Sequence, residues 1–192
     1  MKKNILTILL VACAMVMFSC GKKAETDSKE IAEDQNEEKF DSTKIEDDTE
    51  FAVEAADAGM LEVKLGELAQ TNASSAKVKE LGQMMITDHG KANEEFKALA
   101  TQKNISLPGA LSEDSQKKYD KLAEKKGADF DKEYSEAMVS GHKDVLSKFQ
   151  KESDEGKDAE IRSWASGKLP TLQHHLDMSQ ATEKAVKEAK KN

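Results

Sequence analysis

Cysteine, proline and aromatic residues are scarce in this 192-residue chain, which has two cysteines, two prolines and nine aromatic side chains. Both cysteines, Cys13 and Cys20, lie near the N-terminus, and the rest of the sequence has none. We therefore expect the remainder of the chain to fold without disulfides, even in an oxidising compartment. Acidic residues outnumber basic ones by 37 to 29. Because basic patches bind nucleic acids and anionic surfaces, we expect no nucleic-acid partner. A Gly-x-Ser-x-Gly elbow and a phosphate-binding glycine loop are also missing.

The first nineteen residues have the pattern of an export signal. Lys2 and Lys3 are followed by an apolar stretch from residue 5 to residue 18, interrupted only by Thr7. About 14 residues are too few for a transmembrane helix, which needs about 20, but they fit a secretory signal. Ser19 is followed directly by Cys20, which resembles the lipobox of bacterial lipoproteins. We therefore predict a signal peptide over 1–19 and lipidation of Cys20; an uncleaved anchor or an ordinary secreted protein are the alternatives.

Lipidation would place the protein in the bacterial cell envelope. Removal of Lys2 and Lys3 with the signal changes the formal net charge from −8 to −10, so the lipid, and not surface charge, must attach the protein to the membrane. Gly21 stands where an aspartate is often associated with inner-membrane retention. This favours the outer membrane, facing the periplasm or the cell surface. The sequence identifies no particular protein partner.

Residues 20–49 are acidic and contain few apolar side chains. Between residues 22 and 50, twelve acidic residues stand against five lysines, and the only large apolar residues are Ile31, Phe40 and Ile45. Such a segment cannot bury enough surface to offset the entropy lost on ordering. We expect a flexible tether between lipid and domain, with an acidic interaction tail as the alternative.

Helical periodicity and strong helix formers dominate from Phe51 onward. The pattern predicts four long helices and one short helix, over residues 49–71, 75–103, 112–126, 128–155 and 158–190. Pro170 should kink or locally open the last of them. Four long amphipathic helices within residues 50–190 indicate one all-α domain, a four-helix bundle with an extra short helix between the second and third long helices.

Four polar residues occupy the predicted inner faces, one on each long helix: Glu62, His89, His142 and His175. At about 1.5 Å per residue their depths along the axis differ by roughly 6 Å or less, so all four could share one layer. Three imidazoles and a carboxylate suit one transition-metal ion such as zinc, copper, iron or nickel. Candidate supporting residues are Asp88 beside His89, Tyr134 two turns before His142, and His174, which neighbours His175 but points about 100° away.

Two other interpretations of this polar layer stay open. Buried histidines with a glutamate can form a hydrogen-bonded layer that fixes helix packing without any metal, as in a structural or interaction lipoprotein. A metal-dependent enzyme would need an open coordination position and a substrate cleft, and the sequence shows neither.

Several segments resemble the DUF4142 family of bacterial envelope proteins. The resembling region covers about residues 51–186, with FAVEAADAGMLE at 51–62, MMITDH at 84–89, FDKEY at 130–134 followed by His142, and LPTLQHHL at 169–176. The resemblance implies a ferritin-like four-helix fold, and its spacing selects His175 over His174. It implies no secure activity, because the family is largely uncharacterised.

Ferritin-like di-iron sites carry a Glu-x-x-His pair on two helices. The residues three positions before the inner histidines are instead Ile86, Val139 and Leu172. A di-iron enzyme is therefore disfavoured, and the leading hypothesis is a lipid-anchored bundle that binds one metal ion for metal handling or stress protection.

Overall fold

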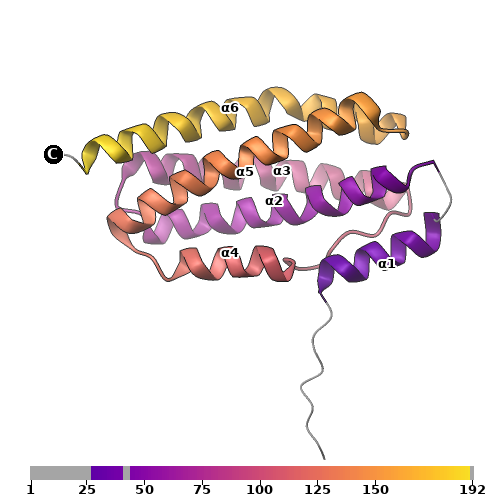
Figure 1. Ribbon diagram of the computed structural model, residues 1–192, viewed down its shortest axis with the longest axis horizontal. Coiled ribbons are helices and arrows are strands. Elements are labelled where there is room, and N and C mark those ends of the chain that lie inside the picture. Colours follow the sequence, from indigo (N-terminus) through magenta and orange to yellow (C-terminus); the bar gives the residue numbers. More distant parts are fainter. Residues whose placement is uncertain (1–26, 41–43, 191–192) are drawn as a thin grey trace, which may run out of the picture.

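The computed structural model describes residues 27–40 and 44–190 (Figure 1). Within these ranges the chain forms six α-helices and no strand, which confirms the predicted all-α helical bundle. The helices are α1 Ser28–Phe40, α2 Glu46–Asn72, α3 Ala76–Gln102, α4 Glu113–Ala123, α5 Gly127–Glu155 and α6 Ala159–Ala189. The five predicted helices correspond to α2–α6 and begin and end within three residues of the predicted limits. The ferritin-like character implied by the resemblance stays a prediction.

The long helices form two hairpins that pack against each other (Figure 1). Short turns join α2 to α3 and α5 to α6, and each pair packs along its length. The segment between α3 and α5 carries α4, which lies against α2. The core has two apolar clusters. One is centred on Leu81, Met85, Phe130, Tyr134 and Met138, and the other on Phe51, Phe96, Phe149, Ile161 and Leu172.

Three buried aspartates fix the beginnings of other helices. Asp131 of α5 accepts hydrogen bonds from the backbone N–H groups of Ser74 and Ser75, just before α3. Asp48 of α2 accepts from the backbone N–H groups of residues 157 and 158, just before α6. Asp57 of α2 accepts from the backbone and hydroxyl of Ser112, the N-cap residue of α4. Because N–H groups at helix beginnings lack intrahelical acceptors, these carboxylates tie the position of each helix to its neighbour.

The prediction of a flexible tether over residues 20–49 is wrong for Ser28–Phe40, which forms α1 and packs against α2. The side chain of Asn36 accepts a hydrogen bond from the Ser106 backbone N–H at 2.7 Å and donates one to the Ser106 carbonyl at 2.9 Å. Only Ala32 and Asn36 of this helix are buried. Phe40, at the end of α1, packs against the second apolar cluster, but the rest of the helix is held mainly by polar contacts, which is why hydrophobic patterning did not reveal it.

Helix α6 continues through Pro170 without the predicted local opening. Proline has no N–H to donate to the carbonyl of residue 166. Both Ser166 and Pro170 are exposed, so water can solvate that carbonyl and the helix tolerates the missing bond.

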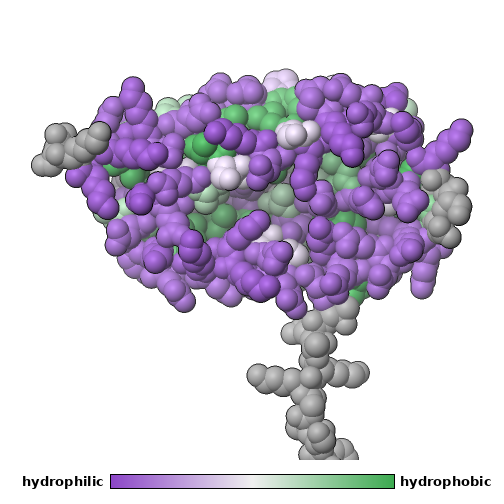
Figure 2. Space-filling view, viewed as in Figure 1, coloured by the Kyte–Doolittle hydropathy of each residue, from purple (hydrophilic) through white to green (hydrophobic). Residues whose placement is uncertain are grey.

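The surface in Figure 2 is mainly hydrophilic, with apolar residues visible in the grooves between helices. Ile31 and Met178 are the large apolar side chains exposed in the described part of the chain. None of the helices in residues 27–40 and 44–190 has the combination of length and apolar character needed to cross a membrane. The predicted signal peptide (1–19) and Cys20 lie outside the described residues.

Candidate metal centre

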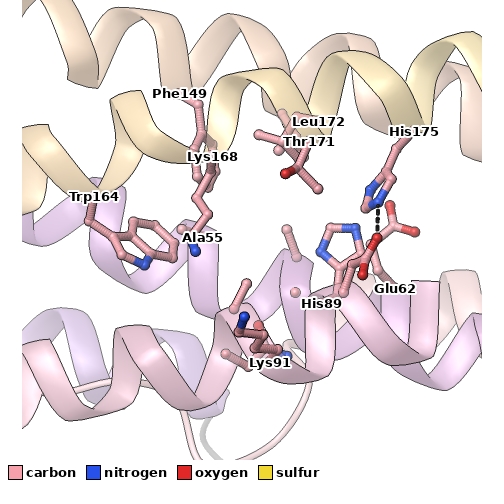
Figure 3. A pocket seen from close by; sticks show the side chains of 16 residues that line it. Ala55, Glu62, His89, Lys91, Phe149, Trp164, Lys168, Thr171, Leu172 and His175 are labelled. Atoms are coloured by element: carbon pink, nitrogen blue, oxygen red, sulfur yellow. Dashed lines mark hydrogen bonds and ion pairs between the residues drawn. The ribbon is translucent and has the colours of Figure 1, made fainter. Parts of the chain in front are cut away.

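His89 of α3, His142 of α5 and His175 of α6 converge in the bundle interior, and we call them the histidine cluster. Each offers one ring nitrogen, and these nitrogens lie within 4.8 Å of one another. The ring centroids are 5.1–5.6 Å apart. The exposed fractions of the three residues are 8%, 1% and 1%. Three helices thus bring three imidazoles to one buried point, and Figure 3 shows two of them, His89 and His175.

The position of the cluster follows from helical periodicity. His89 and His142 lie one turn after Met85 and Met138, which belong to the first apolar cluster. His89 and His142 also precede Phe96 and Phe149, which belong to the second. Residues four apart share a helix face, so both histidines point inward. The histidine cluster therefore forms a polar layer between the two apolar clusters of the core.

Hydrogen bonds fix two of the imidazole rings. The Nδ1–H of His142 donates to the carbonyl of Met138 at 2.9 Å, since a carbonyl oxygen only accepts. The Nε2 atom of His175 lies 2.9 Å from Oδ2 of Asp88, the dashed contact in Figure 3. With a carboxylate as acceptor, Nε2 carries the proton. The opposite nitrogens, Nε2 of His142 and Nδ1 of His175, are therefore free of protons in the neutral rings.

One nitrogen on each histidine is buried with no hydrogen-bond partner among the described residues. These atoms are Nε2 of His89, Nε2 of His142 and Nδ1 of His175. Buried polar atoms usually have a partner, and an exception calls for an explanation such as a water or an ion. In His142 and His175 the partnerless nitrogen is the one opposite the bonded nitrogen, which is the arrangement of metal-binding histidines.

Burial favours the neutral, metal-binding form of His89 and His175. Burial, together with the nearby His142 and His175, lowers the pKa of His89 to about 3. Burial also lowers the pKa of His175, although its hydrogen bond to Asp88 acts in the opposite direction. Near neutral pH both rings are therefore uncharged and can act as ligands.

Glu62 of α2 lies beside the cluster but outside the set of converging ligand atoms. Its Oε1 atom is 3.9 Å from Nδ1 of His142, the nitrogen already bonded to Met138. Glu62 is 6% exposed, and its burial raises the pKa of the carboxyl. The structure thus brings together three of the four predicted ligands and places the fourth next to them.

The three predicted supporting residues, Asp88, Tyr134 and His174, differ in how they lie relative to the histidine cluster. Asp88 neighbours His89 in sequence but bonds His175. Tyr134 is buried and stacks on Phe130 at 5.5 Å, and burial with the nearby Glu62 charge raises the pKa of its hydroxyl. His174 is exposed, with its ring 6.5 Å from that of His175. Of these residues, only Asp88 contacts a cluster imidazole through a hydrogen bond in the described structure.

A cavity of about 210 Å³ opens onto one side of the cluster, and we call it the histidine pocket. It is lined by His89, His175 and Glu62 at one end and by Phe149 and Trp164 at the other (Figure 3), and Asp88 also belongs to its lining. Trp164 was not among the residues that the sequence analysis singled out, although it lines the same cavity as His89 and His175. The only indication in the sequence was the position of Trp164, which lies eleven residues, or about three helical turns, before His175 on α6.

The fold and the cluster together define an all-helical bundle with three buried histidines that could hold a metal ion. The family model described as "Domain of unknown function (DUF4142)" matches residues 32–182, and the chain belongs to this family. The matched region includes most of α1 and all three histidines. Searches of curated proteins and of solved structures gave no significant match.

Proposed function

We propose that this protein is a lipoprotein, anchored through Cys20 in the bacterial cell envelope, whose helical domain binds one transition-metal ion through the histidine cluster. Its role is metal handling or stress protection at the envelope. Support for the anchor comes from the signal-like residues 1–19 and the serine–cysteine junction that follows. Support for the metal comes from the geometry of the cluster.

The observation that carries the metal proposal is that the three histidines each offer a ring nitrogen within 4.8 Å of the other two, and that each also has one buried nitrogen without a partner in the described structure. A metal ion would satisfy all three at once, while Met138 and Asp88 accept the protons on the opposite nitrogens of His142 and His175. A carboxylate behind a ligand histidine orients the ring and makes it a better donor. The arrangement therefore favours metal coordination over three separate core histidines.

The donor set restricts the metal to ions that accept imidazole nitrogen: zinc, copper, nickel and iron. Metal–nitrogen bonds of about 2.0–2.1 Å place nitrogens about 3.3–3.6 Å apart around one ion. The ring nitrogens here lie within 4.8 Å, so binding requires rotations that move them inward by about 1 Å. With three histidines as ligands, a tetrahedral ion keeps one further position for Glu62, water or a small ligand.

Metal loading of the full chain in mild detergent tests the proposal. The protein is stripped with a chelator, dialysed separately against zinc, copper, nickel and iron(II), and analysed for bound metal. We expect one equivalent of at least one metal, lost in His89→Ala, His142→Ala and His175→Ala. His174→Ala is the matched control, because it removes the exposed neighbour of His175 and should bind like the wild type. Metal-free wild-type protein under all four conditions would refute metal binding.

A structural role without metal is the competing function, favoured by the hydrogen bonds that hold His142 and His175 without an ion. It predicts that the three alanine variants lose stability to the same extent with and without metal. The lipid anchor is tested separately. Cys20→Ser should move the protein from the membrane fraction to the soluble fraction, and retention in the membrane would contradict lipidation at this residue.

A further inference from the structure

A second cavity, of about 530 Å³, lies between α1, α2, α4 and α5 and shares Glu62 with the histidine pocket. We call it the acidic pocket, because its walls carry six carboxylates, those of Asp27, Glu54, Asp57, Glu62, Asp114 and Asp144. Three lysines, Lys29, Lys118 and Lys148, also line it. The lining therefore has a negative balance that attracts cations.

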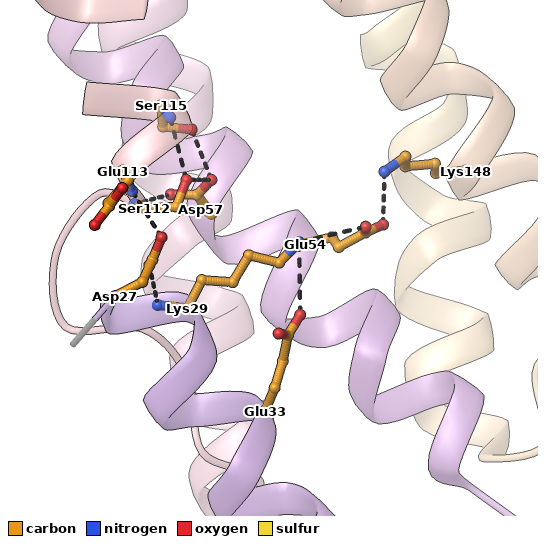
Figure 4. A network of polar contacts seen from close by, with 9 residues as sticks. All are labelled: Asp27, Lys29, Glu33, Glu54, Asp57, Ser112, Glu113, Ser115 and Lys148. Atoms are coloured by element: carbon orange, nitrogen blue, oxygen red, sulfur yellow. Dashed lines mark hydrogen bonds and ion pairs between the residues drawn. The ribbon is translucent and has the colours of Figure 1, made fainter. Parts of the chain in front are cut away.

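Two of the three lysines are engaged by a single carboxylate. Lys148 lies 2.6 Å from Glu54, and Lys29 lies 3.6 Å from the same residue (Figure 4). Asp57 accepts hydrogen bonds from Ser112 and Ser115 in the same figure. Because both lysines pair with Glu54, they neutralise little of the charge on the other carboxylates of the pocket. One of these carboxylates, Asp144, is exposed at the rim.

Glu62 is shared by the two cavities and lines both of them. It is 6% exposed, and its Oε2 atom is buried with no partner in the described part of the chain. Its other oxygen, Oε1, is 3.9 Å from the His142 ring. A buried carboxylate between an acidic cavity and three ligand nitrogens can bind a cation on one side and release it on the other.

Gly141 of α5 gives the Glu62 carboxylate its space. A Cβ atom at this position would lie 3.3 Å from Oε1 of Glu62, closer than ordinary van der Waals contact. Glycine within a helix is less favourable than alanine, so its presence here has a conformational cost. Gly141 also lines the acidic pocket, so a larger side chain here would narrow the passage beside Glu62.

The histidine pocket presents a less favourable route for cations. Lys91 and Lys168 line it and share one partner, Glu95, while its carboxylate Asp88 is bonded to His175. The histidine pocket carries two ammonium groups and two carboxylates, whereas the acidic pocket carries three ammonium groups and six carboxylates. The charge distribution therefore favours approach through the acidic pocket.

We propose that Glu62 is a transit ligand: a divalent transition-metal ion enters through the acidic pocket, is held briefly by the Glu62 carboxylate, and passes to the histidine cluster. This inference rests on the proposed metal binding. A transit ligand accelerates binding and release equally and leaves the affinity unchanged, whereas a resident ligand contributes to the affinity itself.

Stopped-flow binding of copper(II) to the metal-free full chain in detergent tests this inference. The readout is quenching of Trp164, the single tryptophan, which lines the histidine pocket. In Glu62→Gln we expect the association and dissociation rates to fall by the same factor, about tenfold or more, with Kd within about twofold of the wild type. Gly141→Val should slow both rates in the same way by obstructing the passage.

Two substitutions serve as matched controls. Glu67→Gln removes an exposed carboxylate from the same helix as Glu62, and Gly167→Val enlarges a helical glycine with open space around it. Both should keep wild-type rates. Circular dichroism confirms that each variant is folded, and Asp144→Asn, exposed at the rim, provides a further variant that should slow association more at low than at high ionic strength.

The outcomes separate the two proposals. A weaker Kd with faster dissociation in Glu62→Gln would make Glu62 a resident ligand and overturn the transit role. Unchanged rates in both Glu62→Gln and Gly141→Val would overturn it while leaving metal binding by the histidines intact. Absence of saturable binding in the wild-type protein would overturn the proposed function itself.

Discussion

Asp88 of α3 accepts a hydrogen bond from Nε2 of His175 of α6, at 2.9 Å. The carboxylate is thus one residue away from His89 in sequence but supports a different histidine, on another helix. This contact joins the two hairpins at the histidine cluster. It also leaves Nδ1 of His175 as the proton-free nitrogen, buried without a partner in the described structure, since the carboxylate accepts the proton on Nε2.

Replacement of Asp88 by asparagine should weaken metal binding. The amide keeps the size of the side chain but removes the charge that makes His175 a strong donor and fixes its tautomer. Loss of such a supporting residue typically reduces metal affinity about 10–100-fold. Competition with a chromophoric chelator measures the change. Asp177→Asn is the control, because Asp177 is an exposed residue on the same helix as His175, and equal Kd values for Asp88→Asn and wild type would contradict the role given to Asp88.

Metal should stabilise the wild-type fold and fail to stabilise a variant without His142. At a free metal concentration of 100 times Kd, binding adds about 2.7 kcal/mol to the free energy of unfolding, or about 5–10 °C in Tm for a domain of this size. His142→Ala removes one of three ligands and should show no shift, while His174→Ala should show the full shift. Thermal unfolding followed by circular dichroism, with and without metal, makes the comparison. Equal shifts in His142→Ala and wild type would show that the metal binds elsewhere.

The helices and the inward direction of the histidines were predictable because they depend on local periodicity. His89 and His142 lie one turn after buried methionines, and that spacing is visible in the sequence. The pairing of Asp88 with His175 was not predictable, because it depends on the rotation and axial offset of α3 against α6. In the same way, the rotation and axial offset of α2 decide whether Glu62 reaches the cluster. Its Oε1 atom lies 3.9 Å from Nδ1 of His142, outside the set of converging ligand atoms.

Helix α1 shows a second limit of sequence patterning. Its sequence has no apolar face, and its acidic composition resembles that of a solvated linker. The helix is held instead mainly by polar contacts, among them two hydrogen bonds between Asn36 and the Ser106 backbone, seventy residues away, and the hydrogen bond from Lys39 to the Asn104 carbonyl. A long-range polar contact of this kind leaves no periodic signal in either segment.

Glu152 of α5 should make the stability of the protein fall as the pH rises. Burial, followed by the charges of Asp48 and Asp158, raises the pKa of Glu152 from 4.5 to about 7. Its contribution to stability is therefore fully present below pH 4.5 and is lost as the pH rises through about 7. The whole shift corresponds to roughly 3 kcal/mol, and solvent screening at this end of the bundle reduces it.

The variant Glu152→Gln removes this ionisation and should be more stable than wild type at pH 8, by about 1–2 kcal/mol. At pH 4.5 the advantage should disappear. Urea denaturation at the two pH values measures the difference, and Glu155→Gln, an exposed neighbour at the same end of α5, is the matched control. A stabilisation in Glu152→Gln that is the same at pH 4.5 and pH 8 would contradict the pKa assignment.

The attachment of α1 should depend on Asn36. In Asn36→Ala the Ser106 N–H and carbonyl lose the partners that the side chain provides, at 2.7 and 2.9 Å. A buried polar group left without a partner costs about 1–3 kcal/mol, and the cost is smaller here because Ser106 is only half-buried and water can partly replace the lost partners. Only two residues of α1 are buried, so even this loss is a large part of what holds the helix. We therefore expect α1 to detach while α2–α6 stay folded.

Hydrogen exchange followed by mass spectrometry should show lost protection in residues 28–40 and unchanged protection in α3 and α5. Glu38→Ala, at an exposed position on the same helix, should leave α1 protected. If α1 stays protected in Asn36→Ala as well, the packing of Ala32 against the domain, and not the contact between Asn36 and Ser106, holds this helix.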